Sequence, residues 1–502
     1  MKARPSQTYT AAFRAAPWHC ALSLLVLIPC TLATEVRAVD GFGWDIERDH
    51  VSLNGLWNVL PGHGEAEVWE PGVAAGLGPW QSVSTPGVLL PEADTEAIRE
   101  TQCVWARRTF ELSPEQAARD ALLRWGSVDF GATAWLNGRH LGLHGTKGPC
   151  TLPVPDGVLR SGENVLMLKV RGWAGVPRGA SGFPLVPTGA AIEGWGSKRP
   201  AIFDDVWLEF YDRAYMKWIL ALPDLEDKSV TFRVWPDGVA ELPAEMEIRA
   251  VVRPQDSAEV SGEARAATAP TGEPTDVRVP LRELHPWCPQ DPFLYTAELQ
   301  LGAGGEPCDV ARFPFGMRQI QVAEGHYRLN GRRLRLRGSN LVNEWRWGDT
   351  FNREVKRYLV DEGRAMNLGC FRTHTLPPPA TWADTCDEHG VMILAELPVL
   401  YNYKEFRFTD EEWAIFHENV LRDATGWVTK LWNHPAIVMW VLSNESREDA
   451  EWEKGPYRDH ILALDPTRPT MRTGGHTEET RDLHTCGNFS YGCEGDILHT
   501  VR

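Results

Sequence analysis

The chain has 502 residues, a hydrophobic content of 43%, a charged content of 24% and a formal net charge of -17. This length exceeds what one hydrophobic core organises, so we expect two to four domains. The composition is that of an ordinary globular protein, and the negative charge argues against a non-specific nucleic-acid binder, which needs cationic surface to displace counterions.

The N-terminus has the layout of a secretory signal. Basic residues at 2, 4 and 14 precede the apolar run 21–28, and small residues follow at 31–33 and 36–38. This is the order of a cleavable signal, and the apolar run is too short for a transmembrane helix. We therefore predict that residues 1–39 are a signal peptide and that the protein is secreted or periplasmic, with no membrane span. A wrongly chosen start codon is the alternative.

Cysteine and tryptophan usage narrows the function only slightly. The 10 Cys include two in the predicted signal and form no CxxC pair, which excludes a zinc ribbon. Disulfides are possible outside the cytoplasm, with Cys486 and Cys493 the closest pair, but unpaired core cysteines fit as well. The 22 Trp either fill cores or offer flat faces on which sugar rings stack.

Two β-rich regions come next in the chain. Residues 40–212 consist of short strands broken by Gly and Pro, and Asn137-Gly138 is a strong hairpin-turn signal, so we predict a β-sandwich. Residues 213–318 continue the β pattern, with strands expected at 230–234 and 247–252. Their length suits an immunoglobulin-like sandwich, in which we expect residues 264–275 to be an exposed loop.

Residues 319–502 change to alternating strands and helices. This order implies parallel βαβ units and predicts an incomplete (β/α)8 TIM barrel, a fold whose active site lies at the carboxyl ends of its strands. We expect strands at 334–338, 368–373, 391–397 and 437–442, weaker ones near 470–472 and 482–484, and helices at 353–366, 379–389 and 410–431.

Glu445 is the residue whose surroundings first indicate chemistry. The apolar strand 437–442 leads into Ser443-Asn444-Glu445, which is where a barrel enzyme exposes catalytic groups. Burial beside Trp and Met would raise the pKa of this carboxyl, as a general acid requires. The alternative is that Asn444 and Glu445 only cap the next helix, and position by itself does not decide between the two.

A series of motifs runs through nearly all of the chain after the predicted signal. The longest, residues 433–445 (NHPAIVMWVLSNE), resembles the acid/base signature of family 2 glycoside hydrolases, which include β-galactosidases, β-glucuronidases and β-mannosidases. Further segments resemble parts of the same family in the same order: 51–57, 83–87, 135–138, 161–166, 205–208, 291–295, 315–318, 327–331, 336–340, 371–374, 386–390 and 395–398.

The resemblance implies a fold and an activity. The expected fold is a jelly-roll sugar-binding-like domain (40–212), an immunoglobulin-like sandwich (213–318) and a TIM-barrel catalytic domain that is missing its last strands (319–502). The expected activity is hydrolysis of O-glycosidic bonds by a retaining double displacement, similar to that of β-galactosidases and β-glucuronidases. The implied partner is a carbohydrate substrate, and no cofactor is expected.

The resemblance also implies roles for individual residues. Glu445 would be the general acid/base, and Asn444 would bond the 2-hydroxyl of the sugar. Arg372 would hold a carboxylate near the nucleophile, unless it makes only a structural ion pair. Glu396 would bind substrate hydroxyls, bind a divalent metal as in some family members, or pair with Arg372. The remaining substrate-binding candidates are His374, Asn340 and Tyr491.

Three departures from the family pattern bear on function. Residues 341–345 replace a region where many members carry two His, and His374 is displaced by one position, so the sugar specificity stays open. The family nucleophile is a Glu after the seventh barrel strand, whereas the late Glu494 lies in a Gly-rich stretch after no apolar strand. We therefore predict that the sequence is incomplete and, by itself, inactive. The alternative is a non-catalytic carbohydrate-binding protein or degenerate homologue.

Overall fold

The computed structural model describes residues 48–64, 69–74, 76–189, 198–238, 246–268, 273–303, 306–324, 326–341, 353–399, 406–444 and 453–471. The predicted signal, the weak strand near 482–484 and the pair Cys486 and Cys493 lie outside these ranges. Within them, no helix is both long enough and apolar enough to cross a bilayer.

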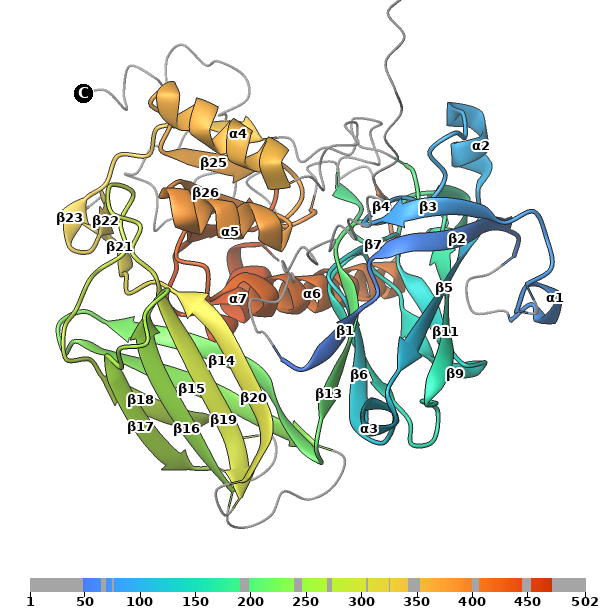
Figure 1. Cartoon of the computed structure of the whole chain (residues 1–502). Coiled ribbons are helices and arrows are strands. Elements are labelled where there is room, and N and C mark those ends of the chain that lie inside the picture. Colours follow the sequence, from blue (N-terminus) through green and yellow to red (C-terminus); the bar gives the residue numbers. More distant parts are fainter. Residues whose placement is uncertain are drawn as a thin grey trace, which may run out of the picture. The chain divides into compact units, whose positions relative to one another are not determined.

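The first domain is an antiparallel β-sandwich with short helical turns (Figure 1). Its elements are β1 (His50–Ser52), β2 (Gly55–Gly62), α1 (Pro71–Ala74), β3 (Gln81–Thr85), β4 (Gly87–Val88), α2 (Thr95–Glu100), β5 (Cys103–Leu112), α3 (Pro114–Ala117), β6 (Asp120–Trp125), β7 (Val128–Asp129), β8 (Ala132–Leu136), β9 (Arg139–His144), β10 (Cys150–Val154), β11 (Gly162–Arg171), η1 (Trp173–Gly175), β12 (Ala201–Ile202) and β13 (Val206–Tyr211). The sheet orders are β1-β13-β6-β10, β3-β2-β5-β11-β8-β9 and β4-β12-β7.

Alternating side chains explain why these segments form a sandwich. Along β11, Leu166, Leu168 and Val170 are fully buried in the core between the sheets, as the period of two in a strand requires. The predicted hairpin turn is confirmed: Asn137 and Gly138 join β8 to β9 with φ values of 51° and 81°, which these two residue types tolerate best.

The second domain is an antiparallel sandwich of the immunoglobulin-like kind, with seven strands among its described residues. Its strands are β14 (Ala214–Asp224), β15 (Ser229–Gly238), β16 (Met246–Pro254), β17 (Gly262–Ala267), β18 (Thr275–Pro280), β19 (Tyr295–Ala303) and β20 (Glu306–Phe315), in the orders β14-β15-β18 and β17-β16-β19-β20. The expectation of an exposed loop over 264–275 is wrong at both ends. Ala264–Ala267 pair with β16 as part of β17, and Thr275 is buried as the first residue of β18.

The third region contains a parallel sheet with helices, which is the described part of a TIM barrel. A small antiparallel sheet precedes it, made of β21 (Ile320–Ala323), β22 (His326–Leu329) and β23 (Arg332–Arg333). The parallel strands follow one another in chain order: β24 (Gly338–Leu341), β25 (Cys370–Thr373), β26 (Met392–Glu396), β27 (Ile437–Val441) and β28 (Thr470–Met471). The helices are α4 (Arg353–Ala365), α5 (Ala380–His389), α6 (Asp410–Leu431), the π-helical turn η5 (Glu453–Tyr457) and α7 (Arg458–Leu464).

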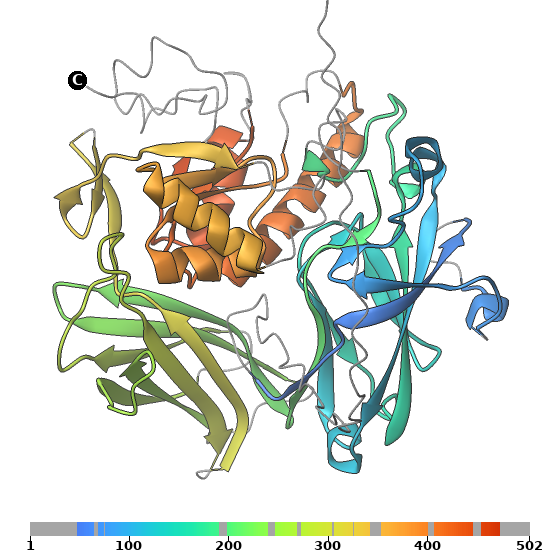
Figure 2. The same cartoon turned by 45° about the horizontal axis from the view of Figure 1, so that its top comes forward.

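The helices of this region lie where alternation with the strands predicts them. Helices α4 and α5 lie side by side in both views, and the long α6 is the orange-red helix of Figure 2. One predicted boundary is wrong. The first parallel strand is Gly338–Leu341 and not 334–338, because pairing with Cys370–Thr373 sets its register.

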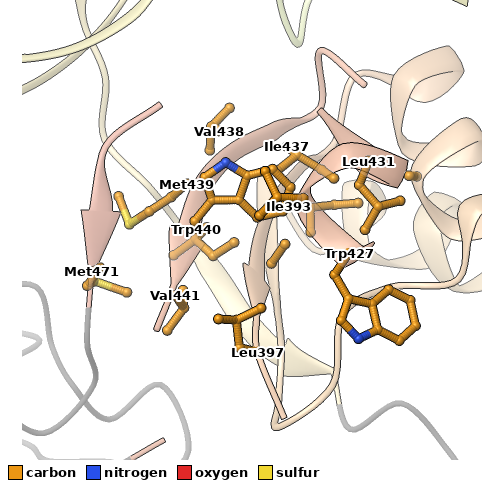
Figure 3. Close-up of a cluster of buried hydrophobic side chains, with 14 of the residues drawn as sticks. Ile393, Leu397, Trp427, Leu431, Ile437, Val438, Met439, Trp440, Val441 and Met471 are labelled. Carbon is orange, nitrogen blue, oxygen red and sulfur yellow. The ribbon is translucent and has the colours of Figure 1, made fainter. Parts of the chain in front are cut away.

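The core of the parallel sheet is built on β27. Figure 3 shows Trp440 among apolar side chains of β26, β27, β28 and α6, including Ile393, Met439 and Leu431. Some of the 22 tryptophans are fully buried, so they fill the core and cannot stack on a sugar ring. These are Trp57, Trp105, Trp125, Trp207, Trp287, Trp427 and Trp440.

The start of the signature motif 433–445 has a structural role. The side chain of Asn433 accepts a hydrogen bond from Ala221 N (2.9 Å) and donates one to Ile219 O (2.9 Å), both on β14. His434 Nδ1 lies 2.6 Å from Asp387 at the end of α5. These contacts fix the beginning of β27, and therefore the position at which its carboxyl end meets the rest of the sheet.

Candidate active site

The carboxyl edge of the parallel sheet gathers polar side chains from four successive strands. Asn340 lies in β24, Arg372 in β25 and Glu396 at the end of β26, and Asn444 follows β27. Parallel strands place their carboxyl ends at one edge, so residues far apart in the sequence meet there. Four of the predicted substrate-binding residues are thus brought together.

A single guanidinium connects these four residues. Arg372 Nε donates to Glu396 Oε2 at 2.5 Å, Nη2 donates to Asn444 Oδ1 at 2.6 Å, and Nη1 donates to Asn340 Oδ1 at 3.3 Å. Nη2 also contacts Glu396 Oε2. The side chains of Arg372 and Glu396 are 1% and 0% exposed, so this ion pair is fully desolvated and depends on good hydrogen-bond geometry.

The donor-only chemistry of arginine fixes the direction of both amides. A guanidinium cannot accept hydrogen bonds, so the Oδ1 atoms of Asn340 and Asn444 must face Arg372 and their Nδ2 groups must face away from it. Asn340 Nδ2 is buried and has no hydrogen-bond partner within the part of the chain that the structure describes. The edge therefore presents amide donors, which suit the lone pairs of hydroxyl oxygens.

Glu396 uses its two oxygens for different neighbours. Oε2 contacts Arg372, while Oε1 accepts from the backbone N of Thr375 at 2.6 Å. Of the three roles weighed for Glu396, pairing with Arg372 is the contact present. Among the described residues no group of three His, Cys, Asp or Glu side chains is placed to hold a metal ion.

His374 directly follows β25, two residues after Arg372, and its ring is uncharged at neutral pH. Burial, followed by the charge of Arg372, lowers the pKa of its imidazole to about 4. Its backbone N donates to Leu341 O at 3.0 Å, and its buried Nδ1 has no partner among the described residues. A neutral imidazole at this edge can donate one hydrogen bond and accept another.

A segment of the first domain reaches this edge. Gly189 N donates to Pro398 O at 3.1 Å, just after β26. Upstream, Ala180 N donates to Glu412 Oε1 at 2.6 Å, and the ring of Phe183 stacks on Phe406 with centroids 4.6 Å apart. The sequence does not predict that this segment belongs to the site, because no local pattern reveals which loop of one domain meets another.

Two predicted site residues lie outside the described part of the chain, Glu445 and Tyr491, as does Glu494. The backbone that leads to Glu445 is described. Asn444 N donates to Val399 O at 2.8 Å, and Asn444 is 3% exposed. The chain therefore passes through the carboxyl edge immediately before Glu445.

Two β-sandwiches followed by a parallel barrel sheet, with a buried arginine, carboxylate and amide cluster at its carboxyl edge, define a multidomain protein of the TIM-barrel class. Comparison with known families makes this specific. The family model "Glycosyl hydrolases family 2" matches residues 214–318, and "Glycosyl hydrolases family 2, TIM barrel domain" matches residues 320–495. The chain belongs to family 2 of the glycosyl hydrolases, as its motifs predicted.

Individual relatives agree with this assignment. A β-galactosidase of Thermoanaerobacter pseudethanolicus is 32% identical over 222 residues, covering 42% of this chain and 28% of the relative. A β-galactosidase of Vibrio cholerae is 23% identical over 514 residues, covering 91% of this chain and 46% of the relative. The chain thus spans less than half the length of these curated relatives.

Solved structures show the same fold. A family 2 β-galacturonidase from Eisenbergiella tayi, bound to galacturonate, superposes with a TM-score of 0.67 and 18% identity, covering 85% of this chain and 72% of that one. A β-D-glucuronidase of Dictyoglomus thermophilum gives a TM-score of 0.66 and 18% identity, covering 86% and 73%. Together they support the sandwich, sandwich and barrel architecture.

Proposed function

We propose that the protein hydrolyses O-glycosidic bonds with retention of configuration, and that Glu445 is its general acid/base. The carbohydrate substrate would be a galactoside, a uronide or a related glycoside, as for the relatives named above. Glycoside hydrolysis needs an acid to protonate the leaving oxygen and a carboxylate to attack or stabilise the anomeric carbon.

The observation that supports this most is the position of Asn444. Its amide is held by Arg372 at the carboxyl edge, 2.6 Å from Nη2, so Glu445 follows directly from a residue fixed in the site. A donor amide next to the acid/base fits a contact to the 2-hydroxyl of the sugar, which strengthens in the transition state. The nucleophile is not assigned to a residue of this chain.

The test compares the complete gene product with its Glu445→Gln variant on a panel of aryl glycosides. Loss of general acid/base catalysis should lower kcat/KM by about 10²–10⁴-fold on the glycosides whose leaving groups need protonation. Glu418→Gln is the matched control, because Glu418 is an exposed residue of α6 paired with Arg422 and should leave turnover unchanged. Equal activity of wild type and Glu445→Gln would contradict the proposal.

Assaying the 502-residue chain beside the complete gene product tests a second part of the proposal. We infer that the nucleophilic Glu is not among residues 1–502, because Glu494, the only late Glu near a possible strand end in the sequence, follows no apolar strand. The chain by itself should then bind sugar without turning it over. Full activity of the 502 residues would show that the nucleophile is one of them.

A further inference from the structure

The turn that follows β25 has a backbone conformation that its residue type disfavours. Thr375 has φ of 59°, in the left-handed region, where a β-branched residue is an outlier. The residue is fully buried, and its Oγ1 has no hydrogen-bond partner among the described residues, so its own side chain gives the turn no such support. Something else must hold the turn in place.

The side chain of Glu396, at the end of the neighbouring strand β26, holds this turn. Glu396 Oε1 accepts the backbone N–H of Thr375 at 2.6 Å, while Oε2 is held by Arg372 at 2.5 Å. The backbone N of Glu396 in turn donates to Thr373 Oγ1 at 3.1 Å. The carboxylate of Glu396 is therefore held in place by contacts other than the one to the turn. Its negative charge strengthens the hydrogen bond from the Thr375 N–H.

A second contact comes from the first domain. A Cβ added to Gly189 would lie 2.5 Å from the carbonyl oxygen of Thr375, so the two backbones touch and no other residue type fits at 189. Gly189 itself has φ of 55° and is tied to Pro398 O. The turn is enclosed between Glu396 and Gly189, and a shift of either would move it.

The turn determines where His374 points. His374 is bonded on one side through its backbone N to Leu341 O and is followed directly by the strained Thr375. We propose that Glu396 is a positioning residue that holds the strained turn at Thr375 and thereby directs the imidazole of His374 toward the carboxyl edge. This assigns Glu396 a role other than contact with substrate or metal.

The inference concerns the same site as the proposed function, but its test does not use turnover, so either can fail without the other. The readout is the NMR titration of the His374 ring in the full chain with labelled histidines, assigned through His374→Gln. In the wild type the pKa should be near 4, because the ring is half-buried and feels the charge of Arg372. A ring released toward solvent should titrate higher.

Two substitutions separate positioning from electrostatics. Glu396→Gln leaves the charge of Arg372 uncompensated, which by itself would lower the pKa of His374 further. Loss of the turn would instead raise that pKa by about one unit or more. Glu396→Asp keeps the charge and withdraws the carboxylate by one methylene, so it should also raise the pKa of His374. If the Gln variant does not fold, the Asp variant provides the same test.

A rescue variant completes the design. Glycine adopts positive φ without a steric penalty, so Thr375→Gly should let the turn keep its shape without the Glu396 bond. Glu396→Gln combined with Thr375→Gly should therefore return the pKa of His374 close to the wild-type value. Asp423→Asn, at a buried carboxyl remote from the turn in sequence, is the control and should leave the pKa of His374 unchanged. An unchanged or lowered pKa in both Glu396 variants would overturn the proposal.

Discussion

The side chain of Arg372 connects the other polar residues of the site. Its guanidinium binds Asn340 of β24, Glu396 of β26 and Asn444 beyond the end of β27, and the residue is 1% exposed. The sequence resemblance indicated that Arg372 belongs to the site, but it left the partner open between a nucleophile, Glu396 and a purely structural pair. Which side chain pairs with Arg372 depends on the register between neighbouring strands, and the residue pattern of a single strand does not contain that information.

Replacing Arg372 by Met should destabilise the barrel region by roughly 3–5 kcal/mol, because it leaves Glu396 as an unpaired buried charge. Arg372→Met combined with Glu396→Met should cost less than Arg372→Met alone, since no charge then remains unpaired. Chemical denaturation measures both. Arg422→Met is the control: its pair with Glu418 is exposed, and such pairs contribute about 0–1 kcal/mol. If Arg372→Met and Arg422→Met lowered the free energy of unfolding equally, the buried pair of Arg372 and Glu396 would not have the proposed importance for stability.

Helix α6 shows how far local patterns reach at the scale of elements. Its bounds, Asp410–Leu431, match the prediction, because Thr409 and Glu412 form a capping box at its start. By contrast, the strand predicted at 334–338 lies three or four residues further on, where pairing with β25 decides its place. The small sheet β21-β22-β23 was not predicted, since its strands are too short to show a period.

A buried carboxyl on α6 makes stability depend on pH. Asp423 accepts the backbone N–H of Gly148 at 3.0 Å, and burial raises its pKa to about 7. The unfolded value is about 3.9, so the folded state holds the proton more tightly. The stabilisation from this group is complete below about pH 4 and is lost as the pH rises to about 7.

Asp423→Asn removes this titration while keeping an acceptor for Gly148. The variant should melt at a higher temperature than the wild type at pH 8, by more than it does at pH 5, because the penalty for ionising Asp423 grows across that window. Thermal unfolding at the two pH values measures the difference. The control is Asp156→Asn, at an exposed carboxyl of the first domain. It should change the melting temperature by the same amount at pH 5 and at pH 8. A larger gain at pH 5 than at pH 8 would be the wrong sign.

At the scale of the whole molecule, a buried charge network joins the two sandwiches. Arg48 pairs with Glu209 on β13 (3.2 Å) and with Asp309 on β20 (3.0 Å), and it donates to Met216 O. Arg124 also pairs with Glu209, at 2.8 Å. One residue near the start of the described chain thus connects strands of both domains in a water-excluded junction.

Arg48→Met should destabilise this junction by roughly 3–5 kcal/mol, because Asp309 loses its guanidinium partner while buried. Differential scanning calorimetry should then show the two sandwiches unfolding in separate transitions in place of a coupled one. Arg233→Met is a suitable control, since its pair with Asp276 is largely exposed. A single unchanged transition in Arg48→Met would show that the network does not couple the domains.

The central claim is that Glu445 donates a proton to the glycosidic oxygen as the leaving group departs, and then takes a proton from the water that hydrolyses the glycosyl-enzyme. The most direct measurement is the dependence of kcat/KM on the leaving group for wild type and Glu445→Gln of the complete gene product. A poor leaving group needs protonation and an activated one does not. The variant should lose about 10²–10⁴-fold on an alkyl glycoside and far less on a dinitrophenyl glycoside. An equal loss on both, or none, would contradict the assignment.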